Sequence, residues 1–237
     1  MPRQNRVTPY GELAAVADRG MFWGNRGQLL DAGGRLARYS RGRLWLICVL
    51  EFKGRLRTQW QPGRLTELYF LDEATGLAAG HRPCGECRYH RYQEFKRAWA
   101  QAHPGEPSGA AAMNARLHAD RLAAPGTRRT YQAPLAGLPD GTMIELAGRP
   151  WLVLGPRLLA WSHGGYQDQQ PRPGGARVSV LTPRATVAVL GAGYRPVLHP
   201  TAAGGGPARH RDRAPGRREG RPETRPAGCS ATTPDGR

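Results

Sequence analysis

Residues 68–88 read LYFLDEATGLAAGHRPCGECR, and this stretch contains the strongest local signals in the chain. A short strand is predicted over 66–70, and the bulky residues at the start of this stretch form its second half. A short helix is expected over Asp72–Ala79, because the Asp72 side chain can accept the free N–H groups of the first turn. Gly80 suits the left-handed residue that ends such a helix. The stretch therefore predicts a strand, a capped helix and a turn that leads into a Cys-x-x-Cys motif.

The motif itself consists of Cys84 and Cys87 on the turn before a further helix. Two thiolates at this spacing can reach one Zn²⁺ at about 2.3 Å each. A tetrahedral site needs two more ligands, and we expect them from His81 and His90. Cys48, on a neighbouring strand, is a further candidate, and the spacing alone does not distinguish these possibilities.

A lone Cys-x-x-Cys motif also has a redox interpretation. Thiols at a helix N-terminus have a lowered pKa, and nearby cations such as Arg82 and Arg88 lower it further. The βαβ context of thioredoxin-type proteins is not evident here, so zinc is the favoured hypothesis. An unmetallated structural pair is the third interpretation. Cys48 lies in an apolar run, where a free cysteine usually behaves as a small hydrophobic residue.

Residues 68–88 resemble the second half of the Ada-type metal-binding domain. In that domain a strand ending in Phe leads through an acidic, Ala-rich helix into a Gly-aromatic-Arg-Pro-Cys-x-x-Cys turn. The resemblance implies that Cys84 and Cys87 correspond to the second of two zinc-ligating cysteine pairs. A cysteine of the first pair accepts methyl groups from phosphotriesters in damaged DNA, and residues 50–67 contain no cysteine. We therefore expect no methyl-acceptor chemistry. The whole chain also resembles bacterial proteins of uncharacterised activity, which implies no function.

Outward from this stretch, the continuous apolar run Leu44–Phe52 predicts a strand covered on both faces. A helix is expected from Gly85 or Glu86 to Gln101, because its aromatic residues recur at helical spacing on one stripe. Such a stripe usually packs in a core. A further helical segment is expected over 110–124.

The residue pattern changes after residue 141, where short apolar runs alternate with turn residues. This pattern predicts an antiparallel meander with strands at 142–146, 151–154 and 157–161, followed by a strand at 177–181. A helix is expected from Thr182-Pro183 to about residue 191. The final segment, 201–237, is rich in Gly, Pro and Arg with almost no large apolar side chains, and predicts a disordered tail.

These elements predict an α+β protein. It has a small mixed sheet with a Cys-x-x-Cys knuckle leading into a helix, a C-terminal antiparallel β meander and a disordered C-terminal tail. The expected regions are an N-terminal segment 1–43, an Ada-like zinc-knuckle region 44–103, a helix and meander region 104–200 and the tail 201–237. No linker is evident between the two middle regions, so a shared core is compatible with the sequence.

The chain is strongly basic, with 35 Lys and Arg against 18 Asp and Glu and a formal net charge of +17. Nearly all of the cations are arginine, whose planar fork binds phosphates bidentately, and counterion release adds affinity. We therefore expect a nucleic-acid partner. The expected phosphate contacts are Arg82, Arg88, Arg91, Arg128 and Arg129. A genome whose base composition favours Arg, Gly, Ala and Pro codons is the alternative cause of the charge.

No stretch approaches the roughly 18 consecutive apolar residues of a membrane span. The polar start of the chain, 1–6, lacks the apolar region of a signal peptide. We expect a soluble, cytoplasmic protein without a membrane partner. The favoured function is a zinc-stabilised nucleic-acid-binding protein linked to DNA repair or regulation. One alternative is an enzyme that acts on a small molecule or modified base with a structural or catalytic zinc, and another is a structural or partner-binding domain.

Overall fold

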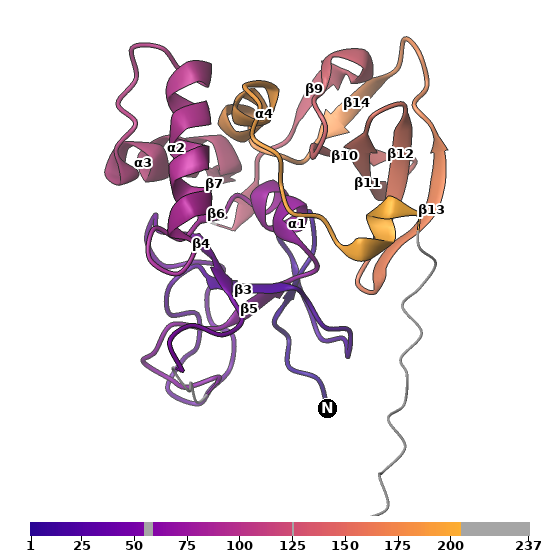
Figure 1. Cartoon of the computed structure of the whole chain (residues 1–237). Helices are drawn as coiled ribbons and strands as arrows, with labels where there is room; N and C mark the ends of the chain where they lie inside the picture. The colour runs from indigo at the N-terminus through magenta and orange to yellow at the C-terminus, as the bar shows by residue number, and fades with distance from the viewer. Residues whose placement is uncertain (55–58, 125, 205–237) are drawn as a thin grey trace, which may run out of the picture.

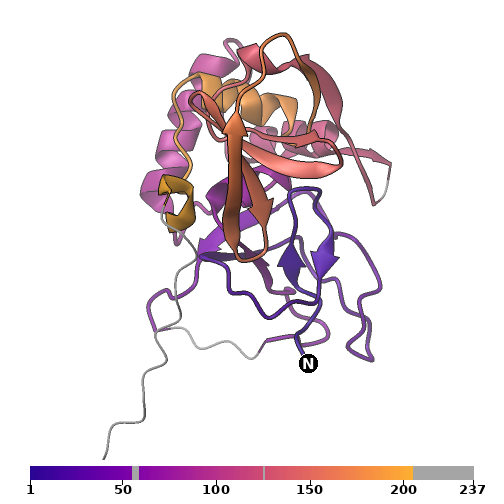
Figure 2. The same cartoon turned by 90° about the vertical axis from the view of Figure 1, so that its right-hand side faces the viewer.

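The structure, a computed structural model, describes residues 1–54, 59–124 and 126–204. It is an α+β fold with two six-stranded sheets, one mixed and one antiparallel, which confirms the predicted fold class. Both views place the N-terminal sheet below the C-terminal sheet (Figure 1, Figure 2), with helices packed between and beside them. Within the described residues, no helix combines the length and the apolar character that a membrane span requires.

The N-terminal sheet is mixed, with strand order β2-β1-β5-β3-β4-β6. Strand β1 runs parallel to β5 and β4 runs parallel to β6, whereas the other pairs are antiparallel. The two predicted strands, 44–52 and 66–70, are both present in shortened form as β4 and β5. The strands are β1 (Arg6–Val7), β2 (Leu13–Ala14), β3 (Phe22–Asn25), β4 (Leu46–Val49), β5 (Leu68–Phe70) and β6 (Arg82–Pro83).

The C-terminal sheet is antiparallel throughout, with strand order β13-β12-β11-β10-β14-β9. The four strands predicted from residue 142 onward are present as β10, β11, β12 and β14. The two strands that were not predicted, β9 and β13, lie at the edges, where polar residues and proline are tolerated. The strands are β9 (Tyr131–Pro134), β10 (Met143–Leu146), β11 (Arg149–Leu154), β12 (Arg157–Ser162), β13 (Gly165–Pro171) and β14 (Arg177–Val180).

The helices are α1 (Glu73–Ala78), α2 (Tyr89–Ala102), α3 (Ala110–Arg121) and α4 (Arg184–Gly191), with 3₁₀ turns η1 (Leu135–Gly137) and η2 (Pro200–Ala203). Helix α2 begins later than predicted because residues 85–88 form turns. Helix α3 ends earlier than predicted because its last residues form β7 (Leu122–Ala124), which pairs with β8 (Thr127–Arg128). On the aromatic stripe of α2, Phe95 and Trp99 are buried in the core as expected, whereas Tyr89 is exposed.

The predicted tail begins too early. Residues Thr201 and Ala202 are buried in η2, and the Thr201 hydroxyl accepts a hydrogen bond of 2.8 Å from the backbone N–H of Tyr166. The prediction of disorder was therefore wrong for residues 201–204, because a short polar segment can be ordered by packing on a sheet. Residues 205–237 lie outside the described part of the chain.

Helix α1 joins the two sheets, and each of its six residues is buried. Leu77 packs into the core that the N-terminal sheet shares with α2, α3 and α4. Ala74 and Ala78, on another face, pack against residues of the C-terminal sheet such as Leu152 and Leu159. A short helix with small residues on one side thus lets both sheets approach it.

The N-terminus of α1 is capped by Asp72, as the sequence predicts. The Asp72 carboxylate accepts hydrogen bonds from the backbone N–H of Thr75 at 2.9 Å and from the Thr75 hydroxyl at 2.8 Å. Its second oxygen accepts from the Tyr166 hydroxyl at 2.7 Å and from the backbone N–H of His199 at 3.1 Å. Burial raises the pKa of Asp72, and these four donors oppose that rise. Asp72 therefore fastens α1 to strand β13 and to the segment before η2.

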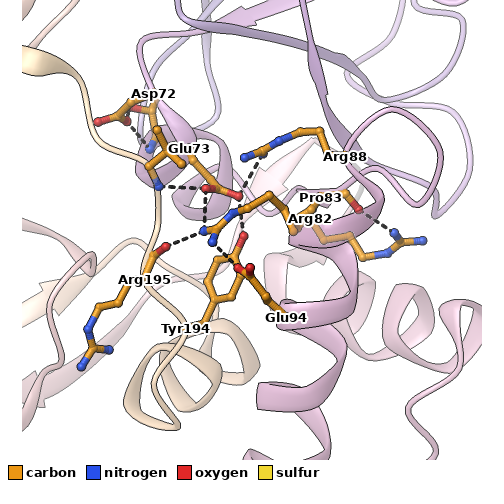
Figure 3. A network of polar contacts seen from close by, with 11 residues as sticks. Asp72, Glu73, Arg82, Pro83, Arg88, Glu94, Tyr194 and Arg195 are labelled. Atoms are coloured by element: carbon orange, nitrogen blue, oxygen red, sulfur yellow. Dashed lines mark hydrogen bonds and ion pairs between the residues drawn. The ribbon is translucent and has the colours of Figure 1, made fainter. Parts of the chain in front are cut away.

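The next residue, Glu73, is fully buried and links α1 to α2 and to the segment after α4 (Figure 3). Its carboxylate lies 2.9 Å from the Arg88 guanidinium and 3.2 Å from that of Arg91. It also accepts hydrogen bonds from the Tyr194 hydroxyl at 2.5 Å and from the backbone N–H of Val197 at 2.8 Å. A buried carboxylate with this many donors is stable, and removal of its charge leaves the buried Arg88 without an acidic partner.

We expect Glu73→Gln to destabilise the protein by about 3–5 kcal/mol, because breaking a buried ion pair leaves an uncompensated charge. Urea unfolding monitored by circular dichroism measures the change. The matched control is Glu94→Gln, which removes the partly exposed partner of the same Arg91 and should cost less than about 1 kcal/mol. Equal unfolding midpoints for the two variants would contradict the role assigned to Glu73.

Candidate metal centre

The position of the cysteines follows from the parallel pairing of β4 with β6. Leu46 is opposite Arg82 and Ile47 is opposite Pro83, and the next residue along the chain is a cysteine in both cases, Cys48 within β4 and Cys84 directly after β6. The backbone N–H of Cys84 donates to the carbonyl of Ile47 at 2.9 Å. This register places Cys84 beside Cys48.

The turn after β6 then brings Cys87 to the same place. The sulfur atoms of Cys48, Cys84 and Cys87 all lie within 4.8 Å of one another. All three cysteines are free, and Cys48 and Cys84 are buried whereas Cys87 is half-buried. Within residues 1–54, 59–124 and 126–204, this is the only group of three or more Cys, His, Asp or Glu side chains at such a separation. Trp23 packs against the cluster.

The three thiols share hydrogen bonds, which affects their ionisation. Hydrogen bonds from Cys48 and Cys87 lower the pKa of Cys84, and the backbone N–H of Glu86 donates to its sulfur at 3.4 Å. The same contacts, with burial, raise the pKa of Cys48. Cys84 is therefore the first of the two to become a thiolate, the form that binds metals. A cation at the cluster would stabilise further thiolates beside it.

The donor set fits a soft, tetrahedral metal ion. Sulfur ligands of zinc bound at about 2.3 Å lie roughly 3.8 Å from one another, and the observed limit of 4.8 Å includes that separation. Three sulfurs are characteristic of zinc or copper(I) sites and unsuited to magnesium or calcium, which take oxygen ligands. The cluster can therefore hold a metal ion through three protein ligands.

The structure does not bring either predicted histidine to this cluster. His81 is completely buried, with its ring 5.1 Å from that of Trp45 and 4.7 Å from that of Phe70, measured between centroids. Its Nε2 accepts a long hydrogen bond, 3.4 Å, from Arg26. His90 is exposed on α2 beside Tyr89. The third cysteine of the group is Cys48, which the sequence left open as an alternative ligand.

Most of the arginines predicted to contact phosphate have partners inside the protein. Arg82 is buried and donates to the Asn114 side chain at 2.8 Å and to the carbonyl of Pro83 at 2.9 Å. Arg88 is buried against Glu73, and the half-buried Arg91 shares that carboxylate. In Figure 3 the guanidinium of Arg82 points away from Glu73, toward Pro83.

The other two predicted contacts differ from each other. Arg128 is half-buried and donates to backbone carbonyls, among them Leu181 at 3.2 Å and Ala79 at 3.4 Å. Arg129 is exposed and donates one long hydrogen bond, 3.4 Å, to the carbonyl of Leu122. Of the five predicted residues, Arg129 is the one whose side chain is presented to solvent.

The fold and the site together define an α+β protein with a three-cysteine candidate metal centre. Comparisons of the chain with known protein families, curated proteins and solved structures found no match. The assignment of the centre therefore rests on the geometry of the three sulfurs.

The position of His81 predicts a pH dependence of stability. Burial, and then the nearby charges of Arg26, Arg121 and Arg128, lower the pKa of His81 well below 6.5. Below pH 6.5 the unfolded chain therefore binds a proton that the native protein does not, and stability falls as the pH falls. For one such proton, the slope of the unfolding free energy against pH approaches about 1.4 kcal/mol per pH unit.

We expect His81→Gln, which removes the titrating group, to show a shallower loss of stability between pH 7 and pH 5. Urea unfolding at a series of pH values measures the stability of both proteins, which are compared at the same metal content. Identical slopes for the two proteins would show that His81 has the same pKa in the folded and unfolded states, and would contradict the lowered pKa.

Proposed function

We propose that Cys48, Cys84 and Cys87 bind a zinc ion that stabilises the fold, and that the protein binds nucleic acid through an exposed arginine face. The observation that carries the first part is the convergence of three free sulfurs within 4.8 Å, two of them buried. The resemblance of residues 68–88 to half of an Ada-type domain supports the same pair, Cys84 and Cys87, as ligands. A role in DNA repair or regulation remains a prediction from that resemblance.

Zinc at this position would act as a structural clamp. It would tie strand β4, through Cys48, to the turn that carries Cys84 and Cys87 and leads into α2. Without such a link, the two-residue strand β6 has few hydrogen bonds to hold it on the sheet edge. Structural zinc sites contribute their binding free energy to folding, so the metal would stabilise this edge directly.

The second part of the proposal concerns an exposed group of arginines, here called the basic face: Arg38, Arg41, Arg43 and Arg129. Three of them come from the segment between β3 and β4. Arg43 and Arg129 are close in space because both contact the same residue, Arg121. The Arg121 guanidinium donates to the Arg43 carbonyl at 2.9 Å, and the Arg129 backbone N–H donates to the Arg121 carbonyl at 3.0 Å.

Exposed arginines are usual contacts to phosphate. Within this face, the Arg41 guanidinium also donates a hydrogen bond to the Gln28 side chain. The basic face therefore replaces most of the contacts chosen from the sequence and retains Arg129. Its phosphate contacts would supply affinity and orientation but no base specificity, because phosphates are the same at every position.

For the metal, we expect protein purified without added metal to contain zinc, and Cys48→Ser to weaken zinc binding by more than about 100-fold. Loss of a mere supporting contact already costs 10–100-fold. Elemental analysis and chelator competition measure the effect, and chelation should lower the melting temperature. His90→Ala is the control. It should keep the zinc content and the zinc affinity of the unmodified protein, because His90 is exposed and outside the cluster. Full zinc content in Cys48→Ser would contradict the proposed ligand set.

For the nucleic acid, we expect a duplex affinity that falls steeply with salt, with a logarithmic slope of about −0.9 for each phosphate contact. Replacing Arg38, Arg41 and Arg43 with Gln should weaken binding and reduce that slope by up to about 2.7. The charge-matched control replaces the exposed Arg19, Arg97 and Arg177, so both variants lose three of the +17 charges. Fluorescence anisotropy at several salt concentrations measures the duplex affinity and its salt slope for each variant. Equal effects of the two variants would show that net charge, and not this face, drives binding.

A further inference from the structure

Beneath the basic face lies a buried cluster of cations that the metal centre does not use. Arg26 is completely buried, Arg121 is 1% exposed and Arg128 is half-buried. The guanidinium carbons of Arg26 and Arg121 lie 4.7 Å and 3.8 Å from the ring centroid of Trp45. Three cations thus share a small, largely apolar volume.

Among the described residues, these three arginines form no ion pair with a carboxylate. Their hydrogen bonds go mainly to backbone carbonyls, such as Gly11 for Arg26 at 2.8 Å and Gly80 for Arg121 at 2.9 Å. Arg26 also donates to the His81 ring at 3.4 Å, and Arg121 contacts the His118 ring at 3.2 Å. Desolvation, together with the charges of neighbouring guanidinium groups, lowers the pKa of Arg26 to about 10 and that of Arg121 to about 9. Buried charges are usually paired, so this arrangement is costly for the protein alone.

Several buried donors in the cluster have no hydrogen-bond partner in the described structure. They are Nη1 of Arg26, Nε of Arg121, the hydroxyl of Tyr39 and Nδ1 of His81. Guanidinium N–H groups donate only, and each needs an acceptor. The Tyr39 ring lies 4.6 Å from the Arg26 guanidinium carbon, so the two side chains are neighbours and interact with each other. The cluster therefore presents unused donors and positive charge in the same place.

A pocket of about 230 Å³ borders this cluster at Arg128, whereas the buried Arg26 and Arg121 lie behind its wall and do not line it. Tyr39 and Arg128 belong to its wall, and Tyr10, Thr130 and the exposed Glu12 line other parts of it. Gly11 lets the backbone approach closely, since a side-chain carbon there would lie 2.5 Å from the Tyr39 hydroxyl and 3.2 Å from Arg128. The volume is below the roughly 300 Å³ at which pockets for drug-sized ligands begin. A small anion fits this space.

We propose that this pocket binds the phosphoryl group of a small phosphate monoester, or phosphate itself. Arg128 and Tyr39 would meet it from the wall, and the buried Arg26 and Arg121 would add positive charge from behind that wall. A phosphoryl dianion matches three guanidinium groups better than a single carboxylate does, and its oxygens accept donors from several directions. The single acidic residue of the wall, Glu12, is exposed, so solvent screens its repulsion. The site requires neither the zinc ion nor binding of nucleic acid.

Calorimetric titration of the full-length protein with inorganic phosphate, at constant ionic strength, tests the proposal. We expect one saturable site, and a second titration with ribose 5-phosphate shows whether an ester is preferred. Tyr39→Phe keeps the ring and should weaken phosphate binding about tenfold, as for loss of a hydrogen bond to a charged group. Arg26→Met removes a buried charge beside Tyr39 and should also weaken phosphate binding.

Arg129→Gln is the matched control, because it removes an exposed cation next to Arg128 and should leave phosphate affinity within about twofold. If circular dichroism shows that Arg26→Met does not fold, the phosphate affinities of Tyr39→Phe and Arg129→Gln are compared to test the proposal. No saturable binding by the unmodified protein, equal affinity in Tyr39→Phe, or an equal loss in Arg129→Gln would each overturn the proposal. Phosphate binding that persists in the Arg38, Arg41 and Arg43 variant would separate this pocket from the nucleic-acid proposal.

Discussion

Two adjacent buried carboxylates, Asp72 and Glu73, hold helix α1 in place, and the rest of the structure depends on that helix. An isolated six-residue helix is unstable in water, since helix nucleation is costly. Asp72 binds the C-terminal sheet through Tyr166, and Glu73 binds α2 through Arg88. Helix α1 therefore exists because both halves of the molecule supply donors to its first turn.

The candidate metal centre is the next consequence of that helix. Gly80, with a φ of 86°, ends α1 and turns the chain directly into β6. Strand β6 then lies parallel to β4 in a register that puts Cys84 beside Cys48, and the following turn adds Cys87. Displacement of α1 would move β6, and the sulfurs would separate. Fold and site are thus linked by a short piece of chain between Asp72 and Cys87.

The parts of this arrangement that were predictable from the sequence are the local ones. The Asp72 cap, the left-handed Gly80 and the apolar strands each carry a signal within a few residues. The third cysteine was not predictable in this way, because Cys48 reaches the motif only through pairing of β4 with β6, and in sequence it resembles a core residue. Edge strand β13 was missed because its residues are mostly polar and it ends in Pro171. Charge composition likewise could not separate exposed arginines from buried ones, since the partner of Arg88 lies on a different helix.

Arginine consequently has more than one function in this protein. Arg88 and Arg91 organise the interior around Glu73, Arg26 and Arg121 pack against Trp45, and the arginines of the basic face are exposed. The central claim remains that the three sulfurs bind one metal ion. X-ray absorption spectroscopy at the zinc edge tests it most directly. The account predicts three sulfur neighbours at about 2.3 Å from the zinc. A zinc ion surrounded mainly by nitrogen and oxygen, or by two sulfurs or fewer, would contradict it.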